Sequence, residues 1–120
     1  MRFRTLCHFL IGCTLATVGQ PLHAEQTDPL QAMVLTGQNN HGWQVLSAHY
    51  ENILEETGLF EVDVVTSPPR DGDMTDFAPD FSRYDVVVIE YNGDEWSDTV
   101  KRSFERYMEQ GGGMVYAHAV

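Results

Sequence analysis

The segment QAMVLTGQNNHGW, residues 31–43, decides how the rest of the chain folds. It begins with a short apolar run, Ala32 to Thr36, which stops at Gly37 and is followed by three amides and a histidine. Continuous apolar runs are typical of parallel strands, because helices cover both faces of such a sheet. The segment therefore predicts a strand, a loop at its carboxyl end, and a helix that begins near Trp43.

Strand and helix patterns alternate along the chain after residue 30. We expect strands over residues 31–36, 60–66, 84–91 and 114–118, helices over 44–57 and from 97 or 98 to 110, and an irregular connection over 70–83. Alternating strands and helices predict an α/β fold with a parallel sheet and right-handed crossovers. The expected architecture is a flavodoxin-like three-layer sandwich, with the strands in the order second, first, third, fourth.

Each predicted helix has an apolar face that we expect to cover the sheet. In the first helix this face consists of Val45, Leu46, Ala48, His49, Ile53 and Leu54, and in the second of Val100, Phe104, Tyr107 and Met108. The strand over 84–91 contains four consecutive β-branched residues, which favours a central position. The strand over 60–66 alternates apolar and acidic residues, so we expect it nearer the edge of the sheet.

Residues 1–24 have the pattern of a secretory signal peptide. Arg2 and Arg4 precede a mostly apolar run of about 13 residues, and the small residue Ala24 stands before Glu25. The run is shorter than the roughly 20 residues of a membrane-spanning helix, although a buried N-terminal helix or an uncleaved anchor stays open as an alternative. We therefore expect a secreted or periplasmic protein, with a disordered lead-in over residues 25–30 and no membrane contact after cleavage.

The composition is strongly acidic. The chain has 7 basic and 18 acidic residues, and removal of Arg2 and Arg4 with the signal peptide leaves 5 against 18, a formal charge of −13. Such a surface repels phosphate backbones, so nucleic-acid binding is not expected. Solubility is the ordinary reason for such a charge, and cation binding is the alternative.

Both cysteines, Cys7 and Cys13, lie in the signal segment, so the mature chain has no thiol for disulfides, nucleophilic catalysis or metal binding.

Three segments at the ends of predicted strands are rich in polar side chains: residues 37–41, 91–95 and 117–119. In the expected strand order they meet at one edge of the sheet, where open α/β sheets bind ligands. The residues that we expect to bind a small-molecule carbohydrate are Gln38, Asn39, Asn40, Asn92 and Asp94. Amide groups both donate and accept hydrogen bonds, as sugar hydroxyls do. A turn or helix-capping role for Asn39 and Asn40 stays open.

Two histidines at this edge, His41 and His118, are the candidate catalytic residues. If the chain is an enzyme, one of them would act as a general base, oriented by Asp94 or Glu95. The same groups are candidate ligands of a divalent metal such as zinc, although their spacing matches no local zinc signature. The plainer alternatives are a surface position for His41 and a structural role for His118, since a buried imidazole must find hydrogen-bond partners.

Six motifs lie in one register between residues 33 and 120. They are VLTGQNNHGW at 34–43, ILEETGxFEVDV at 53–64, SPP at 67–69, FAPDFSxYDVVV at 77–88, YNGDEW at 91–96 and GGGMVYAHA at 111–119. Together they resemble the ThuA-like, or trehalose-utilisation, family. The resemblance implies a fold similar to that of class I glutamine amidotransferases, a link to the use of trehalose or related sugars, and a secreted or periplasmic location for some members.

The resemblance also bears on the chemistry of the site. The amidotransferases carry a catalytic cysteine where this sequence has His118, and an imidazole cannot form their thioester, so glutamine hydrolysis is excluded. What carries over is the pocket position of His41, Asn92 and His118. The family's domain is longer than this chain, so we expect residues 31–120 to be its N-terminal part and the chain to be a fragment.

The expected function is that of a ThuA-like domain in carbohydrate utilisation, which binds a sugar and, if it is an enzyme, modifies it. The alternatives are a non-catalytic sugar-binding or interaction module, or an inactive truncated fragment. The substrate, the existence of catalysis, the metal requirement and the oligomeric state are open at the level of sequence.

Overall fold

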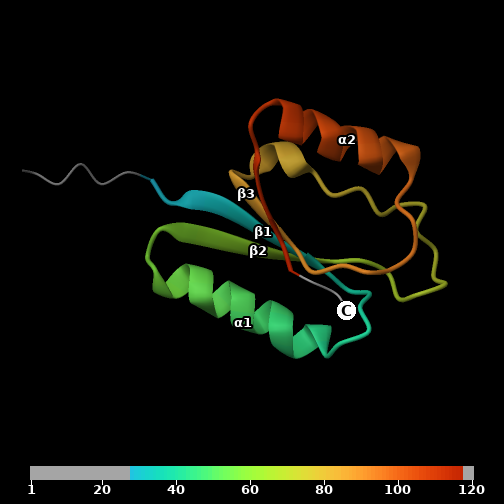
Figure 1. Cartoon of the computed structure of the whole chain (residues 1–120), viewed down its shortest axis with the longest axis horizontal. Coiled ribbons are helices and arrows are strands. Elements are labelled where there is room, and N and C mark those ends of the chain that lie inside the picture. Colours follow the sequence, from blue (N-terminus) through green and yellow to red (C-terminus); the bar gives the residue numbers. More distant parts are fainter. Residues whose placement is uncertain (1–27, 118–120) are drawn as a thin grey trace, which may run out of the picture.

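The computed structural model describes residues 28–117, which form a four-stranded parallel sheet with helices on both faces (Figure 1). The elements are β1 (Leu30–Thr36), α1 (Trp43–Glu56), β2 (Phe60–Thr66), the 3-10 turn η1 (Phe81–Arg83), β3 (Val86–Ile89), α2 (Asp98–Glu109) and β4 (Gly113–Tyr116). The strands lie in the order β2-β1-β3-β4, and every neighbouring pair is parallel. The predicted α/β, flavodoxin-like sheet and its strand order are therefore confirmed, while the predicted signal peptide and His118 lie outside the described residues.

The two central strands, β1 and β3, carry the most apolar sequences. Ala32, Met33, Val34 and Leu35 are fully buried in β1, and Val87, Val88 and Ile89 are buried in β3. This burial on both faces is what the continuous apolar runs predict. The acidic, alternating strand β2 lies at one edge of the sheet, also as predicted, and β4 lies at the other.

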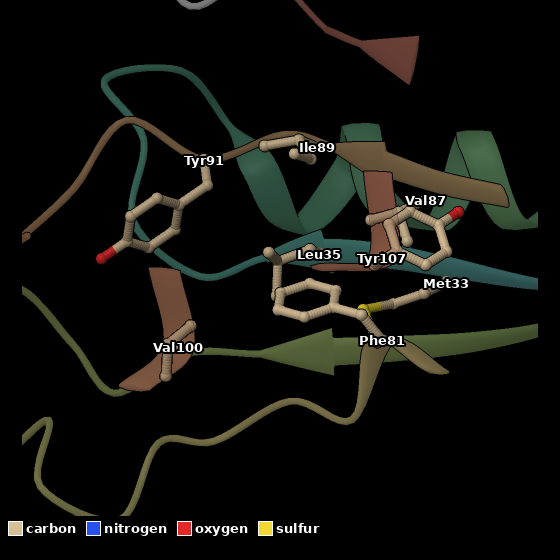
Figure 2. Close-up of a cluster of buried hydrophobic side chains, with 8 residues drawn as sticks. All are labelled: Met33, Leu35, Phe81, Val87, Ile89, Tyr91, Val100 and Tyr107. Atoms are coloured by element: carbon tan, nitrogen blue, oxygen red, sulfur yellow. The ribbon is translucent and has the colours of Figure 1, made fainter. Parts of the chain in front are cut away.

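The register divides the apolar side chains between the two faces of the sheet. Figure 1 shows α1 on one face, and α2 with η1 on the other. On the α2 side a core cluster joins strand, turn and helix; it consists of Met33, Leu35, Phe81, Val87, Ile89, Tyr91, Val100 and Tyr107 (Figure 2). Phe81 is its centre, with ring centroids of Phe104 and Trp96 at 5.1 and 6.0 Å. The irregular connection thus contributes the anchor that holds α2 on the sheet.

Helix α2 begins and packs largely as the sequence predicts. Its N-cap is Ser97, whose hydroxyl accepts a hydrogen bond from the Val100 N–H at 3.3 Å. Val100 and Tyr107 are buried and Phe104 packs against the core cluster. Met108 does not: 39% of its surface is exposed, so its assignment to the inward face is wrong. The helix ends one residue after it, where the chain leaves the sheet surface for the turn into β4.

The face of helix α1 that packs against the sheet differs from the predicted one. Its buried and partly buried residues are Trp43, Leu46, Ser47, Tyr50, Glu51 and Leu54. Val45 is 75% exposed, and Ala48, His49 and Ile53 are also exposed, so only Leu46 and Leu54 were placed correctly. The small Ser47 packs inward because its hydroxyl donates to the Trp43 carbonyl at 2.7 Å and needs no other partner.

Neither helix of residues 28–117 is long and apolar enough to cross a membrane.

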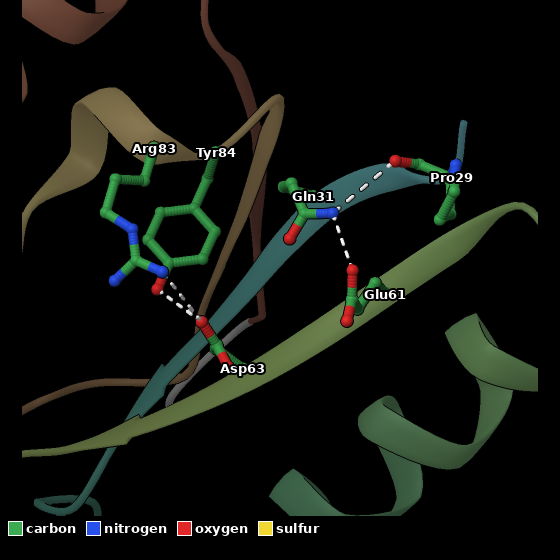
Figure 3. A network of polar contacts seen from close by, with 6 residues as sticks. All are labelled: Pro29, Gln31, Glu61, Asp63, Arg83 and Tyr84. Atoms are coloured by element: carbon green, nitrogen blue, oxygen red, sulfur yellow. Dashed lines mark hydrogen bonds and ion pairs between the residues drawn. The ribbon is translucent and has the colours of Figure 1, made fainter. Parts of the chain in front are cut away.

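The edge strand β2 carries acidic side chains that form polar contacts on the α2 side of the sheet (Figure 3). Tyr84 donates its hydroxyl to the Asp63 carboxylate at 2.8 Å, and Arg83 lies 4.0 Å from the same carboxylate. Gln31 donates to Glu61 at 2.9 Å across the β1–β2 pair. Because Tyr84 turns toward β2, the predicted strand over 84–91 is too long, and β3 begins at Val86.

Candidate functional site

The carboxyl ends of the strands form one edge, which we call the rim and define as residues 37–42, 67–70 and 90–95. Strand-like backbone hydrogen bonds continue into it: the Ser67 N–H donates to the Thr36 carbonyl at 2.8 Å, and the Glu90 N–H donates to the Leu35 carbonyl at 2.9 Å. Beyond the last residue of β4, the Ala117 N–H donates to Ile89 at 2.9 Å. The segments that follow all four strands therefore start from the same edge, as the sequence predicts.

Gly37 begins the rim with a backbone conformation that suits glycine. Its φ is +123°, and a Cβ atom there would lie 2.5 Å from Ser67 Oγ and 2.6 Å from Ser67 N. A side chain would thus collide with the backbone that follows β2. The glycine lets the loops after β1 and β2 lie against each other.

Gln38 joins three of the rim segments. Its side chain is 2% exposed; Nε2 donates to the Pro68 carbonyl at 2.8 Å, and Oε1 accepts from the Asp94 N–H at 2.7 Å. Its own carbonyl accepts from the Asn92 N–H at 2.8 Å. Gly93 packs against this side chain so closely that a Cβ atom there would overlap it. The structure therefore gives the amide of Gln38 backbone partners, and its predicted contact with a ligand stays a prediction.

The next three predicted residues lie in the loop before α1. Asn39 is partly buried, and its side-chain oxygen accepts from the His41 N–H at 3.2 Å, which forms an Asx turn. Asn40 and His41 are exposed. The N-cap of α1 is Gly42, and no side chain caps it, so neither asparagine has the capping role that was left open. The imidazole of His41 is presented to solvent on the rim.

Asn92 and Asp94 lie in the loop after β3. Asn92 is exposed, and its carbonyl accepts from Arg70 at 2.6 Å. Asp94 is partly buried, and its carboxylate accepts from the Asp71 N–H at 2.7 Å. Asp71 has a φ of +60°, a conformation that aspartate tolerates better than most residues. These contacts tie the loop after β3 to the connection after β2, and they occupy one oxygen of Asp94.

The neighbouring carboxylate, Glu95, points to a different partner. It is exposed and forms an ion pair with Lys101 of α2. The hydrogen bond to Lys101 is the main cause that lowers the pKa of this carboxyl. Within residues 28–117 there is no group of three or more histidine, cysteine or acidic side chains that could hold a metal ion. His118, the other proposed ligand, lies outside the described residues.

Sequence reasoning missed Glu90, the first rim residue after β3. Its side chain is 2% exposed, and Thr36 Oγ1 donates to its Oε2 at 3.3 Å. Among residues 28–117, its Oε1 has no hydrogen-bond partner. Burial raises the pKa of this carboxyl, while the hydrogen bond from Thr36 and the charge of His41 lower it. The signal was present in the sequence: strand alternation places Glu90 on the same face as Val86 and Val88.

A hollow of about 250 Å³ lies at the opposite, amino-terminal edge of the sheet. It is lined by Ser82, Tyr84, Asp85, Tyr107 and Gln110 to Gly112. Asp85 accepts from the Gln31 N–H at 2.8 Å, and Tyr107 donates to the Gly113 carbonyl at 2.6 Å, so these polar groups connect strands and α2. The contacts indicate a structural role for this edge, and the rim remains the better candidate site.

Comparison with known proteins gives two similar structures. No family model matches the chain, and no curated protein sequence matches it. A crystal structure of a protein from Parabacteroides merdae, described as ThuA-like, is 47% identical with a TM-score of 0.74, over 77% of this chain and 33% of that one. A second protein described as ThuA-like, from Bacteroides uniformis, has 21% identity and a TM-score of 0.56, over 84% of this chain and 40% of that one, and supports the fold alone. The chain thus spans a third or somewhat more of the length of the structures it matches.

Proposed function

Because the chain belongs to the ThuA-like family, we propose that it binds a carbohydrate at the rim and serves in the use of trehalose or a related glycoside. The proposal is supported by one observation above all: the loops after β1 and β3 are held together by Gln38, while Asn40, His41 and Asn92 beside them are exposed. Amides and an imidazole can donate and accept hydrogen bonds, as the hydroxyl groups of a sugar require. A site held by backbone contacts also loses little entropy on binding.

Titration calorimetry with trehalose, maltose, sucrose and glucose tests the proposal. We expect at least one of these sugars to bind, and the affinity to fall about tenfold or more in the double variant His41→Ala, Asn92→Ala. Asn52→Ala is the matched control, because Asn52 is an exposed amide on the solvent side of α1, away from the rim. Absence of binding by this chain and by the longer Parabacteroides merdae protein would overturn the proposal.

Catalysis is a separate part of the proposal. If the sugar is modified, His41 would act as the general base, because it is the exposed imidazole of the described rim. Asp94 and Glu95 have partners elsewhere, in Asp71 and Lys101, so neither is shown to orient it. A chain that binds a sugar and leaves it unchanged would favour the alternative, a non-catalytic sugar-binding module.

We propose further that the protein is exported through residues 1–24. The support is the sequence pattern: two arginines, an apolar run and a small residue before Glu25. N-terminal sequencing of the protein from its host should give a first residue of Glu25. A mature protein that starts at Met1 in the cytoplasm would contradict export.

A further inference from the structure

Arg70 carries an exposed positive charge at the rim. It is the one lysine or arginine of the rim, and its side chain is exposed. Its guanidinium donates one hydrogen bond, from Nη2 to the Asn92 carbonyl at 2.6 Å. Among residues 28–117 no carboxylate forms an ion pair with it. A guanidinium has five N–H donors, so most of those of Arg70 are open to a ligand.

The acidic side chains of the rim are bonded elsewhere or buried. The carboxylate of Asp94 accepts a hydrogen bond from the Asp71 N–H at 2.7 Å. Glu95 forms an ion pair with Lys101 of α2, and Glu90 is 2% exposed. None of these three carboxylates therefore compensates the positive charge of the rim by direct contact.

The turn after β2 keeps the guanidinium apart from Asp94. Arg70 bonds to the carbonyl of Asn92, and Asp94 bonds to the N–H of Asp71, so each charged side chain meets a neutral main-chain group of the opposite loop. The turn has a φ of +60° at Asp71, which is unfavourable for residues other than glycine. The Asn92 N–H donates in turn to the Gln38 carbonyl at 2.8 Å. The guanidinium is thus held in place without a counter-charge.

The surroundings of Arg70 decide how an anion can bind there. The chain is acidic, and Asp71 beside Arg70 is exposed, so long-range attraction of anions is weak. Binding must come from direct contact. The planar guanidinium can offer two parallel N–H groups to the oxygens of a carboxylate or a phosphate, and such charged hydrogen bonds are roughly twice as strong as neutral ones. Among carbohydrates, uronic acids and sugar phosphates carry these groups.

We propose that Arg70 binds an anionic group of the ligand, and that the ligand of the rim is therefore an acidic sugar or glycoside. The inference rests on the proposed carbohydrate function and specifies its substrate class. The hydroxyl groups of the same sugar would bind the exposed side chains of His41 and Asn92, in loops that Gln38 joins to the loop of Arg70. Arg70 has a binding role, and no covalent step is assigned to it.

The first experiment compares three sugars that differ at one carbon atom: glucose, glucuronate and glucose 6-phosphate. In titration calorimetry at low ionic strength we expect glucuronate or glucose 6-phosphate to bind about tenfold or more tightly than glucose, and the tighter of the two distinguishes a carboxylate from a phosphate ligand. Arg70→Gln should abolish this preference. Arg70→Lys keeps the charge without the planar donors and should lose most of it. Arg102→Gln, at an exposed position of α2, is the control and should keep it. Equal affinities for the three sugars in the wild type, or an unchanged preference in Arg70→Gln, would overturn the proposal.

The second experiment asks whether Arg70 only ties the two loops together. Because its contact with Asn92 is exposed, we expect the melting temperature of Arg70→Gln to stay within about 2 °C of the wild type. A larger fall in melting temperature, together with equal loss of affinity for glucose and for the acidic sugars, would make Arg70 a structural residue and overturn the proposal.

The third experiment separates the anion site from the carbohydrate function. The Nε–H resonance of Arg70 is followed by nitrogen-15 NMR while acetate or inorganic phosphate is added, with Arg102 as the internal control. We expect the Arg70 resonance to shift more than that of Arg102. Such a shift without binding of any sugar would reject the carbohydrate function and keep the anion site. Binding of neutral sugars without any response of Arg70 to acetate or phosphate would keep the carbohydrate function and reject the anion site.

Discussion

Replacing Gln38 with methionine should test the residue that holds the rim together. The change keeps the length of the side chain and removes its bonds to the Pro68 carbonyl and the Asp94 N–H, at 2.8 and 2.7 Å. A buried group left without a partner costs about 1–3 kcal/mol. Since Pro68 and Asp94 are partly exposed, water can replace some of this loss, and we expect about 2–4 kcal/mol in total. That is a large part of the roughly 5–15 kcal/mol that stabilises a typical domain.

Urea unfolding followed by circular dichroism gives the free energy of unfolding for this comparison. Asn52→Met is the matched control, because Asn52 is exposed on α1 and its replacement should change the free energy by less than about 0.5 kcal/mol. A loss below about 0.5 kcal/mol for Gln38→Met would refute the structural role. If that variant instead lost sugar binding at unchanged stability, Gln38 would be a ligand-binding residue, as the sequence alone predicts.

Three further substitutions test other features of the fold and the rim. Gly37→Ala places a side chain against Ser67 at a φ of +123°, and should lower the free energy of unfolding by about 2–5 kcal/mol. Gly58→Ala, at a φ of +67° with no atom within 4 Å of the added Cβ, should lower it by only about 1–2 kcal/mol. Equal losses for the two variants in thermal unfolding would contradict the contact at Gly37. Burial raises the pKa of folded Glu90 above 4.5, so the stabilising contribution of its neutral form is present below that pH and is lost as pH rises through the folded pKa. Above pH 4.5 the stability of the wild type should therefore fall relative to Glu90→Gln by up to about 1.4 kcal/mol per pH unit. Parallel stability curves of the two proteins in pH-dependent urea unfolding would contradict this. Ser97→Ala should lower the stability by about 1 kcal/mol through loss of the α2 N-cap, and an unchanged urea midpoint would contradict it.

The elements that the sequence predicted well are those in which the spacing of apolar residues fits one kind of secondary structure. The apolar run before Gly37 and the β-branched run that contains Val86 to Ile89 indicate buried strands, and their alternation with helices indicates a parallel sheet. The strand order was expected from the flavodoxin-like architecture, and the structure has that order. Helix α1 was harder, because apolar residues occur on more than one of its faces. Val45 and Ile53 fit a helical stripe as well as Trp43 and Leu54 do, so the choice of the buried face is made by packing against the sheet.

The candidate site shows the same division. Strand ends and polar loops can be located in the sequence, so the rim was predictable, including the exposed positions of His41 and Asn92. Whether an amide turns inward depends on partners far along the chain: Gln38 binds Pro68 and Asp94, 30 and 56 residues away. Glu90 was missed for a similar reason, since a carboxylate next to an apolar run normally marks the solvated end of a strand.

Strand β4 has a practical consequence for work with this protein. Met114, Val115 and Tyr116 have 45–56% of their surface exposed, and among residues 28–117 no strand pairs with the outer side of β4. Backbone groups and apolar side chains are thus offered together to any second strand in solution. Concentrated samples should form dimers and larger species through this strand, with light scattering that grows with protein concentration. Replacing Val115 with lysine should keep the preparation monodisperse, which makes that variant the better starting point for titrations and spectroscopy.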